Sequence, residues 1–394
     1  MEQGAPASAG PFDTNEAVAE FEHSRAAFAS LVCPQTRLDL ELCTVQEAER
    51  RVGTGLVPRA DALNTRGKLS RPVGRTPWVL LRADLACAYP VVSGVPVLMV
   101  PEALTPGDRR RTVDLTEPRY AEAYEEMEYY GEVATEDARQ ITASQDVPGY
   151  AALLAAGQAK MDSFPHPREL WIDGVYDCAA QWDAYQHIAP VRGKVVMQLG
   201  GKGGHAVKFL LAGAAEAWVV TPMLEEALYA RTLAEQLGVG DRLRCAAAVA
   251  EEMPLRSGSV DAIFSGACLH HMQTEMALPE IARVLREGGR FSAVDPWRAP
   301  LYAIGIRLVG KREPSVHCKP LTKERVAPVW SAFRKARVVQ HGTLTRYPLI
   351  ALSKFGIESP LNVVWYFNKV DDALCSVLPG MRRMGSSVAV LGSK

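Results

Sequence analysis

Short apolar runs alternate with longer amphipathic segments through the second half of the chain. The apolar runs Val195–Leu199, Ala217–Val220, Val260–Ser265 and Arg290–Val294 predict strands, and the segments Ala206–Leu211, Met223–Leu237 and Leu278–Leu285 predict helices between them. A run that is apolar at nearly every position is typical of a strand buried on both faces. Strands that alternate with helices predict an α/β fold with a doubly wound, Rossmann-like parallel sheet.

The first half shows a different pattern. Residues 15–31 have helical periodicity, and two β-rich runs follow at Trp78–Leu81 and Tyr89–Val100. The second run contains a Ser93-Gly94 pair between apolar residues, which is typical of a hairpin or a bent strand. The pattern predicts a small β-rich module ahead of the sheet.

Charged and helical segments connect the two halves. Residues 105–135 are rich in charge, and residues 148–190 are helical and aromatic in pattern. The stretch Tyr120–Val133 is consistent with a lid over a pocket or with an amphipathic helix that buries Tyr124, Met127 and Tyr130. We therefore divide the chain into a tail with a helix (1–30), the β-rich module (31–104), a helical connector or lid (105–190), the α/β core (191–300) and a C-terminal extension (301–394).

Length and charge limit the classes of protein that fit. The 394 residues allow two or three domains, and 44 basic against 45 acidic residues leave a formal charge of −1. This balance argues against bulk nucleic-acid binding but does not exclude a nucleotide in a local pocket. The apolar fraction of 48% and the charged fraction of 23% are those of a globular chain.

Cysteine usage and the N-terminus bear on location. The eight cysteines are scattered and form no Cys-x-x-Cys pair, which indicates reduced thiols. The N-terminal residues are acidic and lack the apolar core of a signal peptide, and no apolar stretch is long enough to span a bilayer. We expect a cytoplasmic protein that acts on a small molecule away from membranes; the sequence does not indicate its oligomeric state.

The strongest local signal is the segment VVMQLGGKGGHAV, residues 195–207. A strand that ends in clustered glycines and opens a helix is typical of nucleotide-binding folds, since glycine permits a sharp turn and leaves room for a ligand at the helix N-terminus. A purely structural turn would carry the same pattern.

Later segments extend this signal. AEEMPLRSGSVDAIF, LHHM and RVLREGG follow the glycine loop in order, and with it they resemble the class I S-adenosylmethionine-dependent methyltransferases over residues 190–300. The resemblance implies in-line methyl transfer from S-adenosylmethionine to a small, biosynthetic acceptor. It places the cofactor against a set of residues along the strand ends: Gln198, Gly200, Gly201, Lys202, Gly203, Gly204, Thr221, Val249 and Ala250.

This chain departs from the family at its acidic positions. Gln198, Thr221 and Val249 stand where the resemblance implies carboxylates, and Lys202 replaces a glycine. Losing the ribose clamp would weaken cofactor affinity by roughly one to three orders of magnitude. Lys202 would repel a sulfonium or extend into solvent, and a loop with Lys202 and His205 would suit an anion. Gln198 and Thr221 retain neutral hydrogen-bonding groups.

A histidine pair follows the third predicted strand of the core. His270 and His271 either line the pocket or supply the general base for methyl transfer, whereas Asp261 is expected to anchor a loop. His317-Cys318 could meet this pair, but adjacent ligands have no recognised metal spacing, so we expect no metal.

Residues 30–104 carry a second resemblance, to the small zinc-binding activator of tRNA and protein methyltransferases. Cys33-Pro34, Tyr89-Pro90 and Gly94-Val95-Pro96 match. Thr36, Arg82 and Leu85 replace the other zinc ligands, and Cys87 is out of register. One thiolate cannot hold zinc, which predicts a degenerate, metal-free zinc-ribbon-like module that packs on the core or presents substrate.

Three functions remain open at this point. The first is methyl transfer with an atypical cofactor site. The second is a methyltransferase fold that catalyses a reaction independent of S-adenosylmethionine or binds an anionic ligand. The third is an inactive regulatory partner of a methyltransferase.

Overall fold

The computed structural model describes most of the chain. The residues described are 28–58, 77–107, 117–144, 178–300, 302, 307, 319–344, 346–357 and 360–394. The expected N-terminal helix therefore lies largely outside the described residues, as do residues 145–177 of the expected connector and the pair His317-Cys318.

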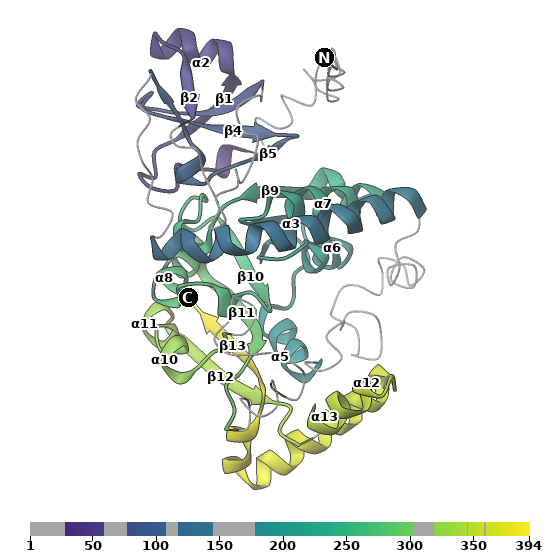
Figure 1. Ribbon diagram of the computed structural model, residues 1–394. Helices are drawn as coiled ribbons and strands as arrows, with labels where there is room; N and C mark the ends of the chain where they lie inside the picture. Colours follow the sequence, from purple (N-terminus) through teal and green to yellow (C-terminus); the bar gives the residue numbers. More distant parts are fainter. Residues whose placement is uncertain are drawn as a thin grey trace.

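An α/β core forms the centre of the molecule (Figure 1). Its described strands form one seven-stranded sheet in the order β12-β13-β11-β10-β7-β8-β9. The strands are β7 (Val195–Leu199), β8 (Glu216–Thr221), β9 (Leu243–Ala247), β10 (Val260–Gly266), β11 (Leu285–Pro296), β12 (Lys335–His341) and β13 (Ser387–Ser393). The helices of this part are α5 (Cys178–Ile188), α6 (Gly204–Leu211), α7 (Leu224–Gln236), α8 (Thr274–Val284), α10 (Lys323–Val326), α11 (Val329–Ala332), α12 (Arg346–Lys354) and α13 (Leu361–Val377).

The parallel half of the sheet confirms the predicted βαβ series. β7 pairs in parallel with β8 on one side and with β10 on the other, so the chain reverses its direction of travel across the sheet beside β7. Ligands of such sheets bind at this kind of switch point, outside the carboxyl ends of the strands. The sequence analysis missed β9, whose Leu-Arg-Cys-Ala-Ala sequence has too few large apolar residues to stand out.

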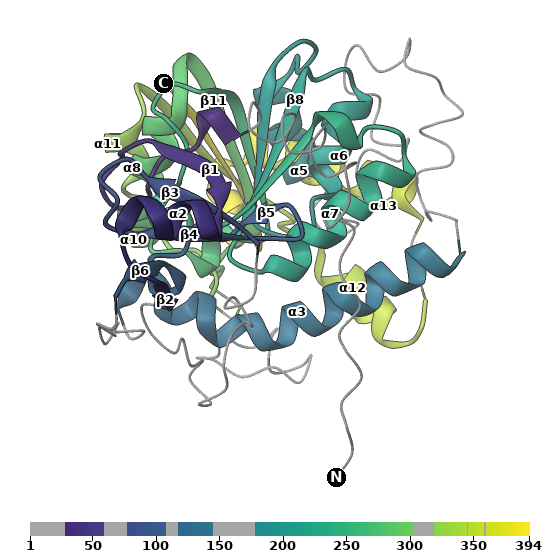
Figure 2. The same ribbon diagram turned by 90° about the horizontal axis from the view of Figure 1, so that it is seen from above.

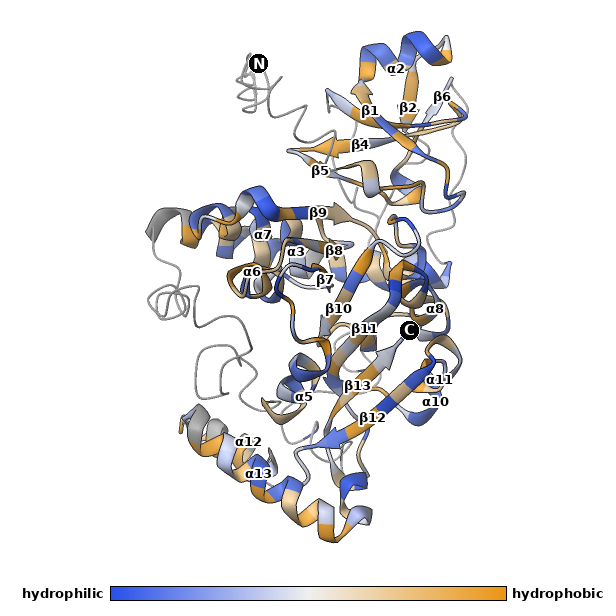
Figure 3. Ribbon diagram, turned by 180° about the vertical axis from the view of Figure 1, so that it is seen from behind, coloured by the Kyte–Doolittle hydropathy of each residue, from blue (hydrophilic) through white to orange (hydrophobic). Residues whose placement is uncertain are grey.

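The C-terminal segment belongs to the core sheet. β13 pairs antiparallel with both β11 and β12, so the predicted boundary at residue 300 divides one sheet. The pairing of β13 with β11 was not predicted, because a pairing across almost 100 residues leaves no local signal. α12 and α13 lie in the chain between β12 and β13 and carry interspersed apolar and polar residues (Figure 3).

The N-terminal module is a second, antiparallel sheet above the core in Figure 1. Its order is β1-β3-β4-β6-β2, with β5 paired to β4. The elements are β1 (Leu40–Thr44), α2 (Val45–Val52), β2 (Leu56–Pro58), β3 (Trp78–Arg82), β4 (Ala88–Val92), β5 (Val95–Pro96) and β6 (Leu104–Pro106). The Ser93-Gly94 hairpin is confirmed, with both residues at positive φ as a tight turn requires.

The module packs directly on the core. Val97 forms a bridge with Ala247 at the end of β9, and Leu31 forms one with Leu255. Buried side chains of the module, among them Leu98, share one apolar cluster with core residues such as Trp218. This contact supports the part of the prediction that placed the module against the core.

One long helix, α3 (Pro118–Ser144), crosses the molecule between the module and the core (Figures 1 and 2). It packs along α7, and its Tyr124 and Met127 are buried as the amphipathic pattern predicted. Within the described residues, no helix combines the length and the apolar character needed to cross a membrane.

Candidate active site

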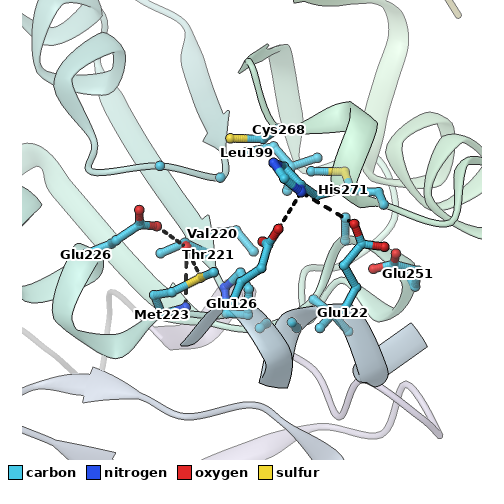
Figure 4. A pocket seen from close by; sticks show the side chains of 18 of the residues that line it. Glu122, Glu126, Leu199, Val220, Thr221, Met223, Glu226, Glu251, Cys268 and His271 are labelled. Atoms are coloured by element: carbon cyan, nitrogen blue, oxygen red, sulfur yellow. Dashed lines mark hydrogen bonds and ion pairs between the residues drawn. The ribbon is translucent and has the colours of Figure 1, made fainter. Parts of the chain in front are cut away.

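An open pocket lies between α3 and the carboxyl ends of the core strands, with about 810 Å³ of empty space that includes the solvent at its mouth. The loops after β7, β8, β9 and β10 form one wall, and the first turns of α3 form the other. The polar or charged residues that line it are Arg119, Glu122, Glu126, Tyr130, Thr221, Glu226, Glu251, Cys268 and His271 (most of them labelled in Figure 4). α3 therefore both buries an apolar face and covers the pocket, which reconciles the two interpretations of residues 120–133.

The glycine loop after β7 is held from beneath by Gln198. The Gln198 side chain accepts a hydrogen bond from the Ala206 amide (2.9 Å) and donates one to the Gly200 carbonyl (2.8 Å). Gly200 has a φ of +79°, and a Cβ there would lie 2.6 Å from the Cys268 sulfur. Gly200 and Gly201 line the pocket, whereas Gln198, Gly203 and Gly204 shape the loop from outside its lining.

The loop residue Lys202 lies outside the pocket lining. Its ammonium group forms an ion pair with Asp137 of α3 and lies 5.5 Å from the centre of the Tyr229 ring. The Lys202 charge, which was expected to repel a sulfonium, is therefore paired with Asp137 and is not among the groups that line the pocket.

His205 is also directed away from the pocket. It hydrogen-bonds through Nδ1 to the Tyr185 hydroxyl (2.6 Å) and packs on the Phe264 ring. The predicted anion site of Lys202 and His205 is therefore not assembled: each side chain is engaged elsewhere.

A carboxylate reaches the end of β8 from the next helix. Thr221, the last residue of β8, donates a hydrogen bond from its hydroxyl to Glu226 of α7 (2.6 Å; Figure 4). Glu226 lines the pocket and is buried, and this burial raises its pKa to about 7 although the Thr221 hydroxyl works in the opposite direction. An acid thus stands beside the position where the sequence analysis found only a threonine.

The loop after β9 supplies a mixed surface. Val249 and Ala250 line the pocket as predicted for cofactor contacts, and Glu251 follows them into the lining. The Glu251 carboxylate accepts a hydrogen bond from the Gln273 amide (2.7 Å), and burial raises its pKa to about 7. Its neighbour Glu252 is directed to Arg119 and Tyr120 and fastens α3 to this loop.

His271 meets two glutamates of α3 at the far end of the pocket. Its Nδ1 forms an ion pair with Glu126 and lies 3.4 Å from Glu122 Oε1 (Figure 4). Burial opposes a charged imidazole, but the two carboxylates outweigh it and raise the pKa of His271 to about 9. Lys319 contacts the other oxygen of Glu122 at 2.8 Å.

His270 is not in the pocket lining. Its Nδ1 and its backbone amide both contact Asp295 Oδ1, at 2.7 and 3.0 Å, and its ring lies 3.8 Å from that of His271. The structure therefore separates the pair into a buried supporting residue, His270, and a pocket residue, His271. The predicted loop anchor Asp261 accepts a hydrogen bond from the Val195 amide and pairs with Arg286, away from the pocket.

Sequence reasoning missed the four pocket glutamates: Glu122, Glu126, Glu226 and Glu251. The spacing of Glu122 and Glu126, four residues apart within a predicted helix, was the available signal, because such residues share one helix face. Nothing local indicated that this face meets His271, about 150 residues away in the chain.

In the N-terminal module, Cys33 forms a hydrogen bond with Cys87, although Cys87 does not stand at a position where the resemblance implies a zinc ligand. The hydrogen bond from Cys87 lowers the pKa of Cys33 to about 4 against the effect of burial. The Tyr89 hydroxyl lies 3.2 Å from the Cys33 sulfur, and the Arg82 guanidinium lies 3.8 Å from it. Two thiols are thus adjacent, with a cationic side chain where the resemblance implied a zinc ligand.

Comparison with known proteins finds a family match within the α/β core of this chain. Residues 197–293 match the profile of the family described as "Methyltransferase domain". A stretch of 45 residues, 11% of this chain, is 49% identical to the uncharacterized methyltransferase Rv3342 of Mycobacterium tuberculosis (strain ATCC 25618 / H37Rv), and the same holds for Mb3374 of Mycobacterium bovis (strain ATCC BAA-935 / AF2122/97). The chain spans 18% of the length of these curated relatives.

Solved structures resemble the chain at low sequence identity. Geranyl diphosphate C-methyltransferase from Streptomyces coelicolor A3(2) is 16% identical with a TM-score of 0.42, over 55% of this chain and 78% of that one. The [4+2]-cyclase SpnF is 16% identical with a TM-score of 0.39, over 66% of this chain and 96% of that one.

The profile match and the strand order concern the same part of the chain. Residues 197–293 match a methyltransferase-domain profile, and they lie within the Rossmann-like α/β core.

Proposed function

We propose that this protein transfers a methyl group from S-adenosylmethionine to a small-molecule acceptor within the pocket under α3. The observation that carries the proposal is Glu226, which is hydrogen-bonded to Thr221 at the end of β8 and faces the pocket. A buried acid at this strand end can accept hydrogen bonds from ribose hydroxyls, the role that the family resemblance assigned to position 221.

The rest of the lining fits the same cofactor. Leu199, Val220, Val249 and Ala250 offer apolar surface for a purine, and the Gly200-Gly201 turn leaves space for the amino-acid end. The carboxylates of the lining suit a sulfonium cation, while Lys202 is held by Asp137 outside it. When bound, S-adenosylmethionine supplies an electrophilic methyl group for in-line displacement.

The chain's own residues position the acceptor. α3 covers the strand ends and limits access of water, since its Tyr120 and Arg119 are tied to Glu252 of the β9 loop. The polar end of the pocket, formed by Glu122, Glu126 and His271, is where an acceptor hydroxyl or amine would find hydrogen-bonding groups. The acceptor proton would pass to one of the two glutamate carboxylates, because the raised pKa of His271 leaves that imidazole protonated near neutral pH. His270 acts only through its contact with His271.

Calorimetric titration of the full chain with S-adenosylmethionine and S-adenosylhomocysteine tests the proposal. We expect saturable binding of one ligand per chain at micromolar concentrations. The absence of heat at millimolar ligand would refute the cofactor assignment, and with it the proposed activity.

A further inference from the structure

Three potential metal-ligand atoms converge at the polar end of the pocket. Glu122 Oε1, Glu126 Oε1 and His271 Nδ1 all lie within 4.8 Å of one another (Figure 4). The two glutamates lie four residues apart on α3 and therefore share one face of that helix. The histidine comes from the short helical turn that follows β10, so the three ligands are brought together only by the packing of α3 against the core.

The same three atoms are buried and face one another. Within the described residues, the contacts found for Glu122 Oε1, Glu126 Oε1 and His271 Nδ1 are the two between the imidazole nitrogen and the carboxylates. Glu126 is 4% exposed and Glu122 8% exposed. One imidazole N–H cannot fully satisfy two buried carboxylate oxygens, whereas one divalent cation would satisfy all three atoms at once.

Surrounding residues hold the ligands in place from behind. Lys319 Nζ binds Glu122 through its other oxygen, Oε2, at 2.8 Å and leaves Oε1 directed at the cluster. The His271 ring packs against that of His270 at an interplanar angle of 42°, and the His270 carbonyl accepts a hydrogen bond from Arg325 at 2.9 Å. Outer contacts of this kind orient metal ligands and are a general feature of metal sites.

We propose that Glu122, Glu126 and His271 bind one divalent transition-metal ion, Mn²⁺ or Zn²⁺, whose remaining coordination positions face the pocket. Carboxylate and imidazole ligands together suit these ions better than Mg²⁺ or Ca²⁺, which prefer oxygen alone. Ligand atoms about 2.0–2.2 Å from a central ion lie roughly 3–4 Å apart, within the observed spread after small side-chain adjustments.

The site adds a function to the pocket. An ion in this place would bind an oxygen of the acceptor and lower the pKa of its hydroxyl, so the acceptors expected are those with a hydroxyl or carboxylate oxygen. Metal binding itself does not depend on the methyl-transfer proposal. The sequence analysis expected no metal because it considered His270-His271 with His317-Cys318; the cluster uses only His271 of these.

Metal titration of the full chain tests this inference. The chelator-treated protein is titrated with Mn²⁺, with free ion followed by electron paramagnetic resonance, and with Zn²⁺ by calorimetry. We expect one ion per chain, and affinity at least 100-fold lower in Glu126→Gln and His271→Gln. Glu125→Gln is the matched control, since it removes an exposed carboxylate from the same helix and should leave affinity unchanged.

Two further measurements keep the outcomes distinct. Circular dichroism verifies that each variant is folded, and Glu126→Asp, which keeps the charge but shortens the ligand, replaces Glu126→Gln if the latter unfolds. S-adenosylhomocysteine binding by the metal-free chain separates this inference from the cofactor proposal. The inference is wrong if the wild-type chain shows no saturable binding at millimolar metal, or if the ligand variants bind as tightly as the wild type.

Discussion

Glu226 provides the sharpest test of the cofactor site, because one substitution should change stability and ligand affinity in opposite directions. Its carboxylate is buried, accepts the Thr221 hydrogen bond and has a pKa raised to about 7 from 4.5. Glu226→Gln replaces a charge with a neutral group of similar shape that still accepts from Thr221. The variant should therefore keep the local structure while losing the buried charge.

The sign of the stability effect follows from proton binding. Between about pH 4.5 and 7 the folded chain holds a proton on Glu226 that the unfolded chain has released, so this group makes the folded state less stable as pH rises through that window. A shift of about 2.5 pKa units, at about 1.36 kcal/mol each, corresponds to roughly 3 kcal/mol. Glu226→Gln should thus stabilise the fold by up to ~3 kcal/mol at pH 8 and hardly at all at pH 4.5.

Ligand affinity should move the other way. A hydrogen bond to a charged acceptor contributes about 1.5–3 kcal/mol, and a neutral one about 0.5–1.5. The difference predicts about tenfold weaker binding of S-adenosylhomocysteine at pH 8.

Urea unfolding at the two pH values and calorimetry at pH 8 provide the measurements for Glu226→Gln. Glu235→Gln, an exposed acid on the same helix, serves as the control and should change neither quantity. A stability gain that is equal at both pH values would refute the burial argument, and unchanged affinity would refute the ribose assignment.

Three more predictions follow from individual contacts. Lys202→Ala should leave S-adenosylhomocysteine affinity within about twofold, because its ammonium is paired with Asp137 outside the lining; a tenfold gain in calorimetry would show that its charge reaches the pocket. Gly203→Ala should lower the free energy of unfolding by roughly 2–4 kcal/mol, since its φ is +79° and a Cβ would collide with α7. Gly258, at φ +66° with open space around it, is the control, and Gly258→Ala should lower the same quantity by about 1 kcal/mol in urea unfolding. Burial lowers the pKa of His341, but ion pairs with two aspartates raise it overall. The stability that this charge contributes is present below about pH 6.5 and is lost as pH rises through the raised pKa. His341→Gln should therefore flatten the decline of the free energy of unfolding above pH 6.5, and identical pH profiles of the variant and the wild type would contradict this.

Much of the core was predictable because its signals are local. Val195–Leu199 is a continuous apolar run, and the structure has β7 at the same residues. The Ser93-Gly94 turn was also predictable, since a glycine between apolar runs marks a tight turn, and Gly94 takes a positive φ of 74° there. Where the local signal was weak, as in the alanine-rich β9, the strand was missed.

The site was predictable only in part. The strand-end residues Gly200, Gly201, Thr221, Val249 and Ala250 were expected to face a ligand, and they line the pocket. The negative charge of the pocket was not predictable. The alignment with the family compared only the residues at the strand ends, and it could not show that the Glu226 carboxylate of α7 lies beside Thr221.

The sequence by itself determined most of the alternating strands and helices of the core and its glycine turn, because hydrophobic periodicity and turn residues act over a few positions. Only the tertiary structure decided which charges face the pocket. α3 crosses the strand ends and brings Glu122 and Glu126 to His271, while Asp137 of the same helix holds Lys202 outside the lining. These contacts join residues more than 60 positions apart, and their electrostatics depend on burial and distance, which no local pattern encodes.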